Sequence, residues 1–368
     1  MPPTTPPPDL PPEYLAEIAR RAHPYPLPPA DFDPLSATDA QLDQYGLPAR
    51  PDQKAEPDLF QYWSWLLGKP FRVITPEFST PGGSAPPAPA DQGSRSGRWG
   101  VRGRENSRNW SGLYIMPQRP NRFVQVIGSW HVPQPSVPPV LPEGAVPDND
   151  EYQSSTWIGI DGHRSYPKSS MPQIGTGQFI RVADGIKTVR TTAWWEWWSK
   201  DDQFPPQNRN NPPVMIANFP VAIGDEISAG VTVQSSDEVR FYIKNQTKGV
   251  FTTFLVIAPG PILPLGSTAE WIMERPTVVG QRRMYPLPNF TEVAFRHCFA
   301  RSASTIGDTL TTQRLDSARA IWMYEVFPNP HRTSFVSLPE KTSNSTFRVR
   351  YRDAPAPGCG GLLGFARD

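Results

Sequence analysis

The sequence predicts an all-β protein in which at least nine antiparallel strands form a two-sheet sandwich or a barrel. The first observation behind this prediction is the presence of 47 prolines and 27 glycines among 368 residues, which excludes long helices from most of the chain. The second is a change of texture at residue 109. From there to about residue 351, short segments rich in Val, Ile, Thr, Trp and Phe alternate with Gly, Pro and Asn, which is the pattern of antiparallel sheet.

Nine segments are expected to be strands because each is short and rich in β-branched or aromatic residues, and none sustains a helical period. They are residues 123–132, 155–160, 192–198, 226–233, 239–245, 252–257, 269–274, 292–299 and 346–351. The gaps at 234–238 and 246–251 are of hairpin length, and a single domain of about 240 residues is within the usual range for a sandwich or a barrel.

The first 78 residues are expected to form a proline-rich, partly helical N-terminal region. Short helices are predicted over residues 12–22, 37–45 and 58–67, and the second of them is predicted to have Ser36 as its N-cap and Gly46 as its stop. By composition, residues 79–108 are a Gly/Pro/Arg-rich linker, residues 109–352 the sandwich domain and residues 353–368 a C-terminal tail.

The charge and hydropathy patterns exclude several classes of partner. The 36 Lys and Arg residues against 35 Asp and Glu give a formal net charge of +1, and nucleic-acid binding by counterion release needs a basic surplus. No run of eighteen apolar residues occurs, so no membrane partner is expected. The opening residues lack the basic and apolar regions of a signal peptide. The two cysteines, Cys298 and Cys359, allow one disulfide at most.

Three predicted strands divide their side chains in the same unusual way. Because successive side chains of a strand point to opposite faces, each segment separates into an apolar set and a set that mixes carboxylates with aromatic or apolar residues. The mixed sets are Trp157, Gly159 and Asp161; Trp194, Glu196 and Trp198; and Glu270, Ile272 and Glu274. This pattern predicts a concave, partly desolvated cleft that holds acids of raised pKa. Taken alone, Asp161 and Gly162 would indicate a turn, and each Glu a solvated strand position.

Other catalytic chemistries find little support in the sequence. The five histidines are scattered, and neither HExxH nor a Cys/His cluster at ligand spacing occurs, so no metal site is expected. The GxSxG, DTG or DSG, GxGxxG and Walker patterns are also missing. Cys298 follows His297, but neighbours on a strand face opposite ways, so Cys298 is expected to be a buried structural thiol.

Six motifs together resemble the glutamic peptidase family, also called eqolisins. They occur in the family's order and with similar gaps: NWSG at 109–112, GSWHVP at 128–133, WIGIDG at 157–162, PQIGTG at 172–177, AWWEW at 193–197 and AEWIME at 269–274. The resemblance covers residues 109–351. It implies an antiparallel two-sheet β-sandwich of concanavalin-like or jelly-roll type, with the site on the concave face of one sheet.

The resemblance also implies the residues of the site. By motif, the catalytic pair is Gln173 and Glu270, and the supporting residues are Trp157, Asp161, Trp194 and Glu196. The pair is 97 positions apart and is expected to meet across neighbouring strands and to hold one water molecule. Family members usually have an acid four residues after the catalytic Gln, where this chain has Gly177, so an outer hydrogen bond should differ.

The implied activity is hydrolysis of peptide bonds in a polypeptide substrate at acid pH, without a cofactor. Glu270 would take a proton from water and later return one to the departing amine, while the Gln173 amide stabilises the oxyanion. Asp161 and Glu196 would be supporting carboxyl groups, and the crowding of acids should keep at least one of them protonated well above about pH 4.

Several alternatives stay open. The N-terminal region is expected either as a propeptide, whose helices lie over the cleft and which is removed near residues 90–108, or as a permanent accessory domain. The sandwich could instead be a catalytically impaired module that binds carbohydrate or peptide. Glu196 and Glu270 could also form the carboxyl pair of a glycosidase. Secreted members of the family act outside the cell, but no export signal is visible here, so the localisation stays open.

Overall fold

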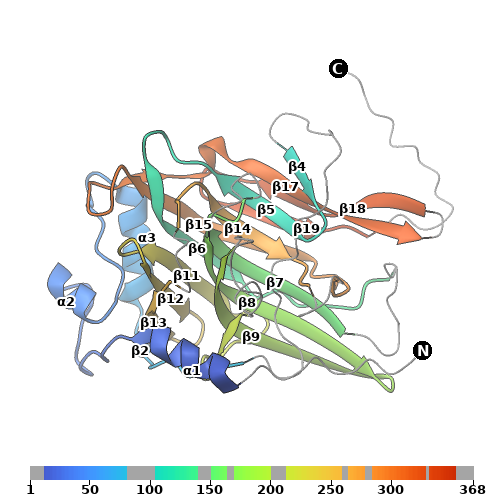
Figure 1. Ribbon diagram of the computed structural model, residues 1–368, viewed down its shortest axis with the longest axis horizontal. Coiled ribbons are helices and arrows are strands. Elements are labelled where there is room, and N and C mark those ends of the chain that lie inside the picture. Colours follow the sequence, from blue (N-terminus) through green and yellow to red (C-terminus); the bar gives the residue numbers. More distant parts are fainter. Residues whose placement is uncertain are drawn as a thin grey trace.

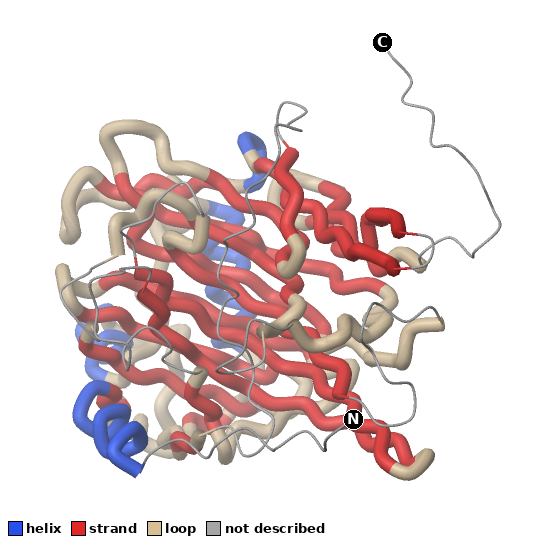
Figure 2. The backbone as a smooth tube through the Cα atoms, turned by 45° about the vertical axis from the view of Figure 1, so that its right-hand side comes forward, coloured by secondary structure: helices blue, strands red, loops and turns tan. Residues whose placement is uncertain are grey.

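The computed structural model describes residues 12–80, 104–139, 151–163, 170–199, 213–258, 264–277, 284–328 and 331–353. Strands dominate this part of the chain (Figure 2), and they pack as two layers with a hydrophobic core between them (Figure 1). The prediction of an all-β antiparallel sandwich, preceded by a partly helical segment, is confirmed.

The first layer carries the candidate site, and the second lies behind it. The helices are α1 (Pro12–Arg21), α2 (Asp39–Gln44), α3 (Pro57–Gly68) and the 3-10 helix η1 (Leu315–Ser317). In pairing order, the first layer is β3 (Phe78–Ser79), β10 (Val214–Ile216), β9 (Ile186–Ser199), β8 (Ser170–Ala183), β7 (Glu151–Ile160), β14 (Ala269–Glu274), β5 (Trp110–Ile115), β17 (Arg319–Pro328) and β4 (Arg104–Ser107).

The second layer is β1 (Ala22–Pro24), β13 (Val250–Ile257), β12 (Glu238–Asn245), β11 (Glu226–Val233), β6 (Arg122–His131), β15 (Glu292–Ala303) and β19 (Phe347–Tyr351), with β2 (Arg72–Val73) beside β13 and β16 (Thr311–Gln313) beside β15. β18 (His331–Lys341) pairs with both β17 and β19 and therefore joins the two layers. The named strands pair antiparallel, except that β2 is parallel to β13 and β4 to β17.

All nine predicted strands are present, as β6, β7, β9, β11, β12, β13, β14, β15 and β19. The sequence patterns missed β5, β8, β17 and β18, among others. β8 is the most important of these for the site. It contains Pro172, Gly175 and Gly177, residue types that are depleted in strands.

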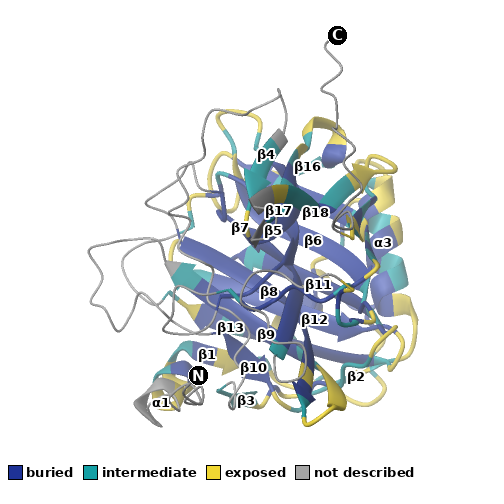
Figure 3. Ribbon diagram, turned by 90° about the vertical axis from the view of Figure 1, so that its right-hand side faces the viewer, coloured by how far each residue is buried: buried dark blue, intermediate teal, exposed yellow. Residues whose placement is uncertain are grey.

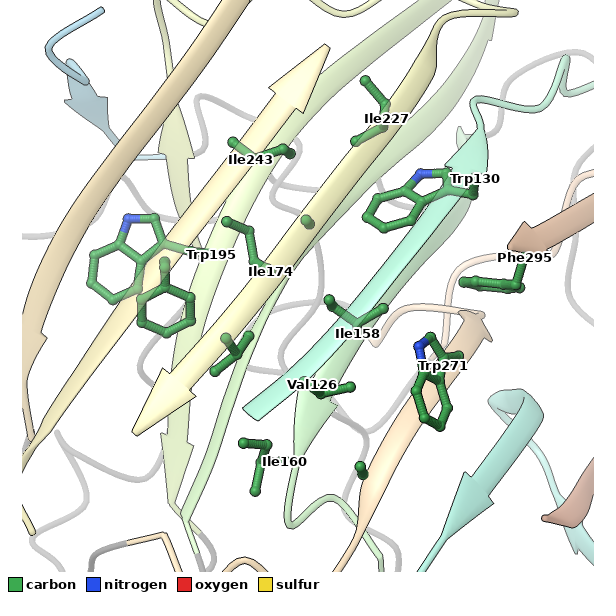
Figure 4. Close-up of a cluster of buried hydrophobic side chains, with 14 of the residues drawn as sticks. Val126, Trp130, Ile158, Ile160, Ile174, Trp195, Ile227, Ile243, Trp271 and Phe295 are labelled. Atoms are coloured by element: carbon green, nitrogen blue, oxygen red, sulfur yellow. The ribbon is translucent and has the colours of Figure 1, made fainter. Parts of the chain in front are cut away.

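The main core lies between the layers (Figure 4). It receives Ile158, Ile160, Ile174, Trp195 and Trp271 from the first layer and Val126, Trp130, Ile227, Ile243 and Phe295 from the second. The apolar sets of β7, β9 and β14 therefore point into this core, as the alternation of their side chains predicted. Two buried indoles find partners across the layers, because Trp130 Nε1 donates to Thr176 Oγ1 at 3.0 Å and Trp271 Nε1 to the Ile127 carbonyl at 2.8 Å.

Helix α2 begins differently from the prediction. Its N-cap is Thr38 rather than Ser36: the Thr38 hydroxyl accepts from the Gln41 N–H, and the Gln41 side chain accepts from the Thr38 N–H. This reciprocal capping box satisfies two N–H groups that would otherwise be unpaired. The predicted stop at Gly46 is confirmed, since this residue has a φ of 64°, a conformation that favours glycine.

The N-terminal helices do not lie where a blocking propeptide was expected. Helix α3 buries Leu59, Tyr62 and Leu66 in a cluster with Tyr242 and Phe251 of the second layer. Figure 3 shows α3 beside β6 and β11, away from β7 and β8. The expectation that the helices cover the carboxylate-bearing face is therefore wrong for α2 and α3, because their apolar residues pack on the outer face of the opposite layer. Helix α1 contacts β1, β3 and β13.

Polar contacts tie the same segment into the sandwich. The fully buried Lys244 donates to the Leu66 carbonyl in the last turn of α3, where the helix dipole favours a cation. Glu56, just before α3, accepts from Arg301 of β15 at 2.8 Å, and the Tyr62 and Tyr242 hydroxyls are 3.1 Å apart. These contacts, together with β1, β2 and β3 in the sheets, make residues 22–79 part of the folded sandwich.

Cleavage of the chain between residues 80 and 104 should therefore leave both fragments in one complex. Separation would expose the apolar surface of α3 and its partners at roughly 25 cal/mol per Å², and would leave Lys244 without its helix carbonyl. The measurement is limited proteolysis followed by size-exclusion chromatography and mass spectrometry of the eluted peak. Elution of the smaller fragment by itself, without denaturant, would show that the segment is a removable propeptide.

Two remaining expectations concern thiols and membranes. Cys298 is a free thiol buried in the core between the layers, as predicted, whereas Cys359 lies outside the described residues. Burial raises the pKa of the Cys298 thiol well above its usual value. Within the described ranges, none of the helices has the length and apolar character needed to cross a membrane.

Candidate active site

The two residues expected to form the catalytic pair lie in one row across the first layer. Strand pairing places Glu196 opposite Gln173, Gln173 opposite Gly159, Gly159 opposite Glu270, and Glu270 opposite Tyr114. Cross-strand partners project from the same face of a sheet. Gln173 and Glu270 are almost fully buried, with exposed fractions of 1% and 0%.

The two strands are not neighbours, which corrects the sequence-based expectation. β7 runs between β8 and β14, so the Gln173 and Glu270 backbones are two strand spacings apart, or about 10 Å. Between them stands Gly159, which has no side chain. A Cβ at Gly159 would lie 3.1 Å from Gln173 Cβ, from the Pro172 carbonyl oxygen and from Trp157 Cζ3. In this row no side chain therefore stands between Gln173 and Glu270, and one at Gly159 would crowd Gln173 and Trp157.

A second row, parallel to the first, places glycines between large apolar residues. It runs Trp194, Gly175, Trp157, Ile272, Gly112 and Ile321. A Cβ at Gly175 would lie only 2.6 Å from Trp157 Cβ, so glycine there makes room for the tryptophan beside it. Trp157, Trp194 and Ile272 belong to a hydrophobic cluster distinct from the inter-layer core. The predicted aromatic and acidic face is thus present, and it is buried.

Hydrogen bonding fixes the orientation of Gln173. Its Nε2 donates to Glu196 Oε2 at 2.6 Å, and Glu196 is buried with an exposed fraction of 1%. Gln173 Oε1 has no hydrogen-bond partner within the described residues. An amide has two N–H donors and one acceptor oxygen, so one N–H and the carbonyl oxygen of Gln173 are left to interact with another molecule.

Two acids of this face, Glu196 and Glu274, are shifted toward their neutral forms. Burial raises the pKa of Glu196 well above its usual value, and the nearby Glu274 raises it further, although the hydrogen bond from Gln173 works in the opposite direction. Burial also raises the pKa of Glu274 from 4.5 to about 7, partly offset by the N–H groups around it. The folded protein thus holds these protons more tightly than the unfolded chain, so the stability that Glu274 contributes is present below about pH 4.5 and lost as the pH rises through about 7.

Asp161 has a positioning function in the structure. It follows the last residue of β7 and has a φ of 70°. Its carboxylate accepts from three consecutive backbone N–H groups, those of residues 265, 266 and 267, at 2.5, 2.9 and 2.6 Å. This segment leads into β14, which carries Glu270 three residues later. Asp161 therefore anchors the entry to the strand of the candidate base.

Gly177 marks the departure from the family pattern, and its surroundings show why an acid would not fit. A Cβ at Gly177 would lie 2.8 Å from the Phe179 ring and 3.1 Å from Thr192 Oγ1. In addition, the Arg190 guanidinium stands 4.9 Å over the Phe179 ring. The space that an acidic side chain would need is thus filled by an aromatic one.

The alternation of β14 placed Glu274 on the face of Glu270, and the structure adds its hydrogen bond with Trp157. Another group near the site was not found by sequence reasoning. Tyr114, opposite Glu270, donates to Glu105 Oε1 at 2.6 Å, and His163 Nε2 lies 2.8 Å from the same oxygen. Tyr114, Glu105 and His163 come from separate segments of the chain, so no local sequence motif indicates that they lie together. Among the described side chains, no three His, Cys, Asp or Glu residues gather as a metal site would require.

Comparison with known proteins gives the following matches. Residues 108–335 match the family model of the Peptidase A4 family. Scytalido-glutamic peptidase, solved with a transition state analog inhibitor, is 19% identical over 66% of this chain and 98% of that chain, with a TM-score of 0.47. SCP-B, an eqolisin solved with the tripeptide Ala-Ile-His, is 19% identical over 66% of this chain and 98% of its own, with a TM-score of 0.45. Aspergilloglutamic peptidase from Aspergillus niger is 20% identical over 55% of this chain and 99% of its own, with a TM-score of 0.42. The curated proteins gave no match.

Proposed function

The chain belongs to the Peptidase A4 family, and from that premise we propose that it is an endopeptidase that hydrolyses peptide bonds at acid pH with Gln173 and Glu270. The observation that carries the proposal is the row in which these two side chains flank Gly159 on a buried face of tryptophans and acids. No metal or cofactor takes part in the proposed reaction.

Gln173 is assigned the stabilisation of the oxyanion. Its amide is oriented by Glu196, which leaves one N–H to donate to the negative oxygen of the tetrahedral intermediate. Its carbonyl oxygen can accept a hydrogen bond from the attacking water. A donor held in place before the reaction, in a site that excludes water, typically contributes about 3 kcal/mol to such a step.

Glu270 is assigned the proton transfers. As a carboxylate it accepts a proton from water while the water oxygen forms a bond to the carbonyl carbon of the substrate. The protonated Glu270 then gives that proton to the amide nitrogen, the carbon–nitrogen bond breaks, and the amine leaves. Glu270 ends the cycle as a carboxylate, so the peptide bond and one water molecule are consumed and nothing else is required.

The state of the neighbouring acids sets the pH range. Glu270 must be ionised to accept a proton, so activity should fall at low pH when it becomes protonated. At the other end, Glu274 is neutral below about pH 7 and ionises as the pH rises through that value. Its negative charge then opposes the charge that develops on the oxyanion. Activity should therefore be confined to the acid range.

The experiment that tests the proposal is digestion of a denatured protein, with a quenched fluorescent peptide as second substrate, between about pH 2 and pH 8. We expect a maximum below about pH 6 and little activity at pH 8. A profile that is flat from pH 4 to 8 would contradict the assignment, since no buried acid would then control the rate. The same reaction with a chelator tests whether a metal is needed.

The buried position of the pair has a consequence for substrate entry. Because Gln173 and Glu270 are 1% and 0% exposed, a peptide can reach them only after the site opens. We separately propose that the chain is cleaved between residues 80 and 104. Helices α2 and α3 would then remain bound to the outer face of the second layer, and mass spectrometry after acid incubation would identify the cleaved bond.

The glycosidase alternative is less well supported by the geometry. Glu196 and Glu270 are three strand spacings apart, or about 14 Å between backbones, with Gln173 and Gly159 between them. Glycosidases place their two carboxyl groups about 5 to 9.5 Å apart, and here the Glu196 carboxyl binds Gln173 instead. A module that only binds sugar or peptide would show saturable binding without release of cleaved peptide.

A further inference from the structure

Glu274 is a buried acid that the proposed reaction does not use directly. It lies on β14, four residues after Glu270 and on the same face, with an exposed fraction of 2%. Its two oxygens accept from different donors: Oε1 from Asn109 Nδ2 at 3.3 Å, and Oε2 from Trp157 Nε1 at 2.7 Å. The shorter hydrogen bond connects Glu274 to Trp157, which belongs to the second row described above.

Trp157 connects Glu274 to Gly159, the residue between the two members of the catalytic pair. The nitrogen edge of its indole is held by Glu274, while Cζ3, on the far edge of the ring, would lie 3.1 Å from a Cβ at Gly159. The ring is fully buried and meets Trp110 edge to face, with ring centroids 5.1 Å apart. Apolar contacts of this kind allow a ring to slide or tilt, whereas a directional hydrogen bond to its N–H does not.

We propose that Glu274 is a positioning residue of the active site, which holds the Trp157 indole so that its far edge lies beside Gly159, between Gln173 and Glu270. The inference rests on the proposed peptidase function, because the position of this edge matters only if Gln173 and Glu270 act on one substrate bond. A shift of about 1 Å in such an edge can reduce the rate of a positioned reaction by about 100-fold.

Two substitutions of Glu274 separate positioning from simple packing. Glu274→Gln keeps an acceptor oxygen for the Trp157 N–H, whereas Glu274→Leu has a similar volume but no acceptor. The leucine variant would leave the buried indole N–H unpaired in an apolar cluster, which is costly, so the ring should leave its present orientation. If this hydrogen bond positions the ring, Glu274→Gln should keep the activity and Glu274→Leu should lose it.

The experiment is a double-mutant cycle between Glu274→Leu and Trp157→Phe, with kcat and KM measured near the acid optimum. We expect each single variant to lower kcat by about 10- to 100-fold with KM changed by less than about 3-fold, and Glu274→Gln to stay within about 3-fold of the wild type. The double variant should lose no more than the worse single variant, because both remove the same interaction. Asp225→Leu is the matched control: Asp225 is a buried acid that accepts from Asn245 Nδ2 at 2.7 Å, so it should lower the unfolding midpoint and leave kcat unchanged.

Three results would overturn the inference while the proposed function stands. These are an active wild type whose Glu274→Leu variant keeps its kcat, losses that multiply in the double variant, and an equal loss of kcat in Asp225→Leu, which would indicate general destabilisation. A wild type without acid peptidase activity would instead overturn the proposed function, and this inference with it.

Discussion

Glu270→Gln and Gln173→Ala are both expected to abolish most of the acid peptidase activity while the protein stays folded. Without the Glu270 carboxylate, the remaining acid of the row is Glu196, which is bonded to Gln173 and whose pKa is raised well above its usual value by burial. We do not expect it to replace Glu270 as the acceptor of the water proton, so kcat should fall by about 100- to 10,000-fold. Without the Gln173 amide, the oxyanion loses a preorganised donor, and a loss of about 100- to 1,000-fold is expected. The measurement is kcat/KM on a quenched peptide near the acid optimum, together with a thermal unfolding curve for each variant.

Matched controls are available on the same elements. Gln178 lies on β8 like Gln173, but an odd number of positions away and so on the opposite face, where its side chain accepts from Ser154 Oγ at 3.1 Å. Gln178→Ala should lower stability and spare activity. Glu226→Gln removes a partly exposed acid of the second layer, 4.0 Å from Arg296. This variant should change neither the stability nor the activity. Full peptidase activity in Gln173→Ala beside an inactive Glu270→Gln would favour a carboxylate mechanism in which the amide takes no part.

Gly159→Val is expected to inactivate the enzyme although it alters no polar group. Even the first added carbon would lie 3.1 Å from Gln173 Cβ, from the Pro172 carbonyl and from Trp157 Cζ3, which is closer than ordinary van der Waals contact. The two further methyl groups of valine must be placed between the strands that carry Gln173 and Glu270. We expect kcat to fall about 10-fold in Gly159→Ala and at least 100-fold in Gly159→Val, with about 1 to 3 kcal/mol of stability lost through overpacking.

The control for this series is Gly68→Ala at the end of α3. A Cβ there meets only Leu35 Cδ1, at 3.5 Å, so the variant should keep both its activity and its unfolding midpoint. If Gly159→Val were fully active, the space above Gly159 would not be where the substrate bond is held. The amide and carboxyl groups would then have to act at separate places.

Much of this protein could be predicted from local sequence patterns. All nine segments rich in β-branched and aromatic residues are strands, because such side chains suit a pleated, half-buried surface. The division of β7, β9 and β14 into a core face and an aromatic, acidic face is also present: Trp195 and Trp271 enter the inter-layer core, while Trp157 and Trp194 lie in the other cluster. The family resemblance, drawn from six motifs, agrees with the family match.

The misses have a common physical cause. β8 was overlooked because Pro172, Gly175 and Gly177 weaken the strand signal, yet Gly175 is needed there to make room beside Trp157. The N-terminal helices were expected over the site because their apolar faces must pack against some surface. The apolar pattern of a helix predicts that this face is buried, but not which surface it packs against. That surface, which includes Tyr242 and Phe251, comes from strands more than 170 residues later.

The alternation of side-chain direction along a strand is a local property. The residues that share a face with Glu270 could therefore be predicted from the sequence once the strand was recognised. The order of strands is not local. Gln173 and Glu270 were expected on neighbouring strands, and the insertion of β7 between them, with Gly159 at the meeting point, depends on how two whole layers pack and on which edges they leave to pair. Long-range pairing of this kind is determined by the summed burial of many side chains, which no single motif contains.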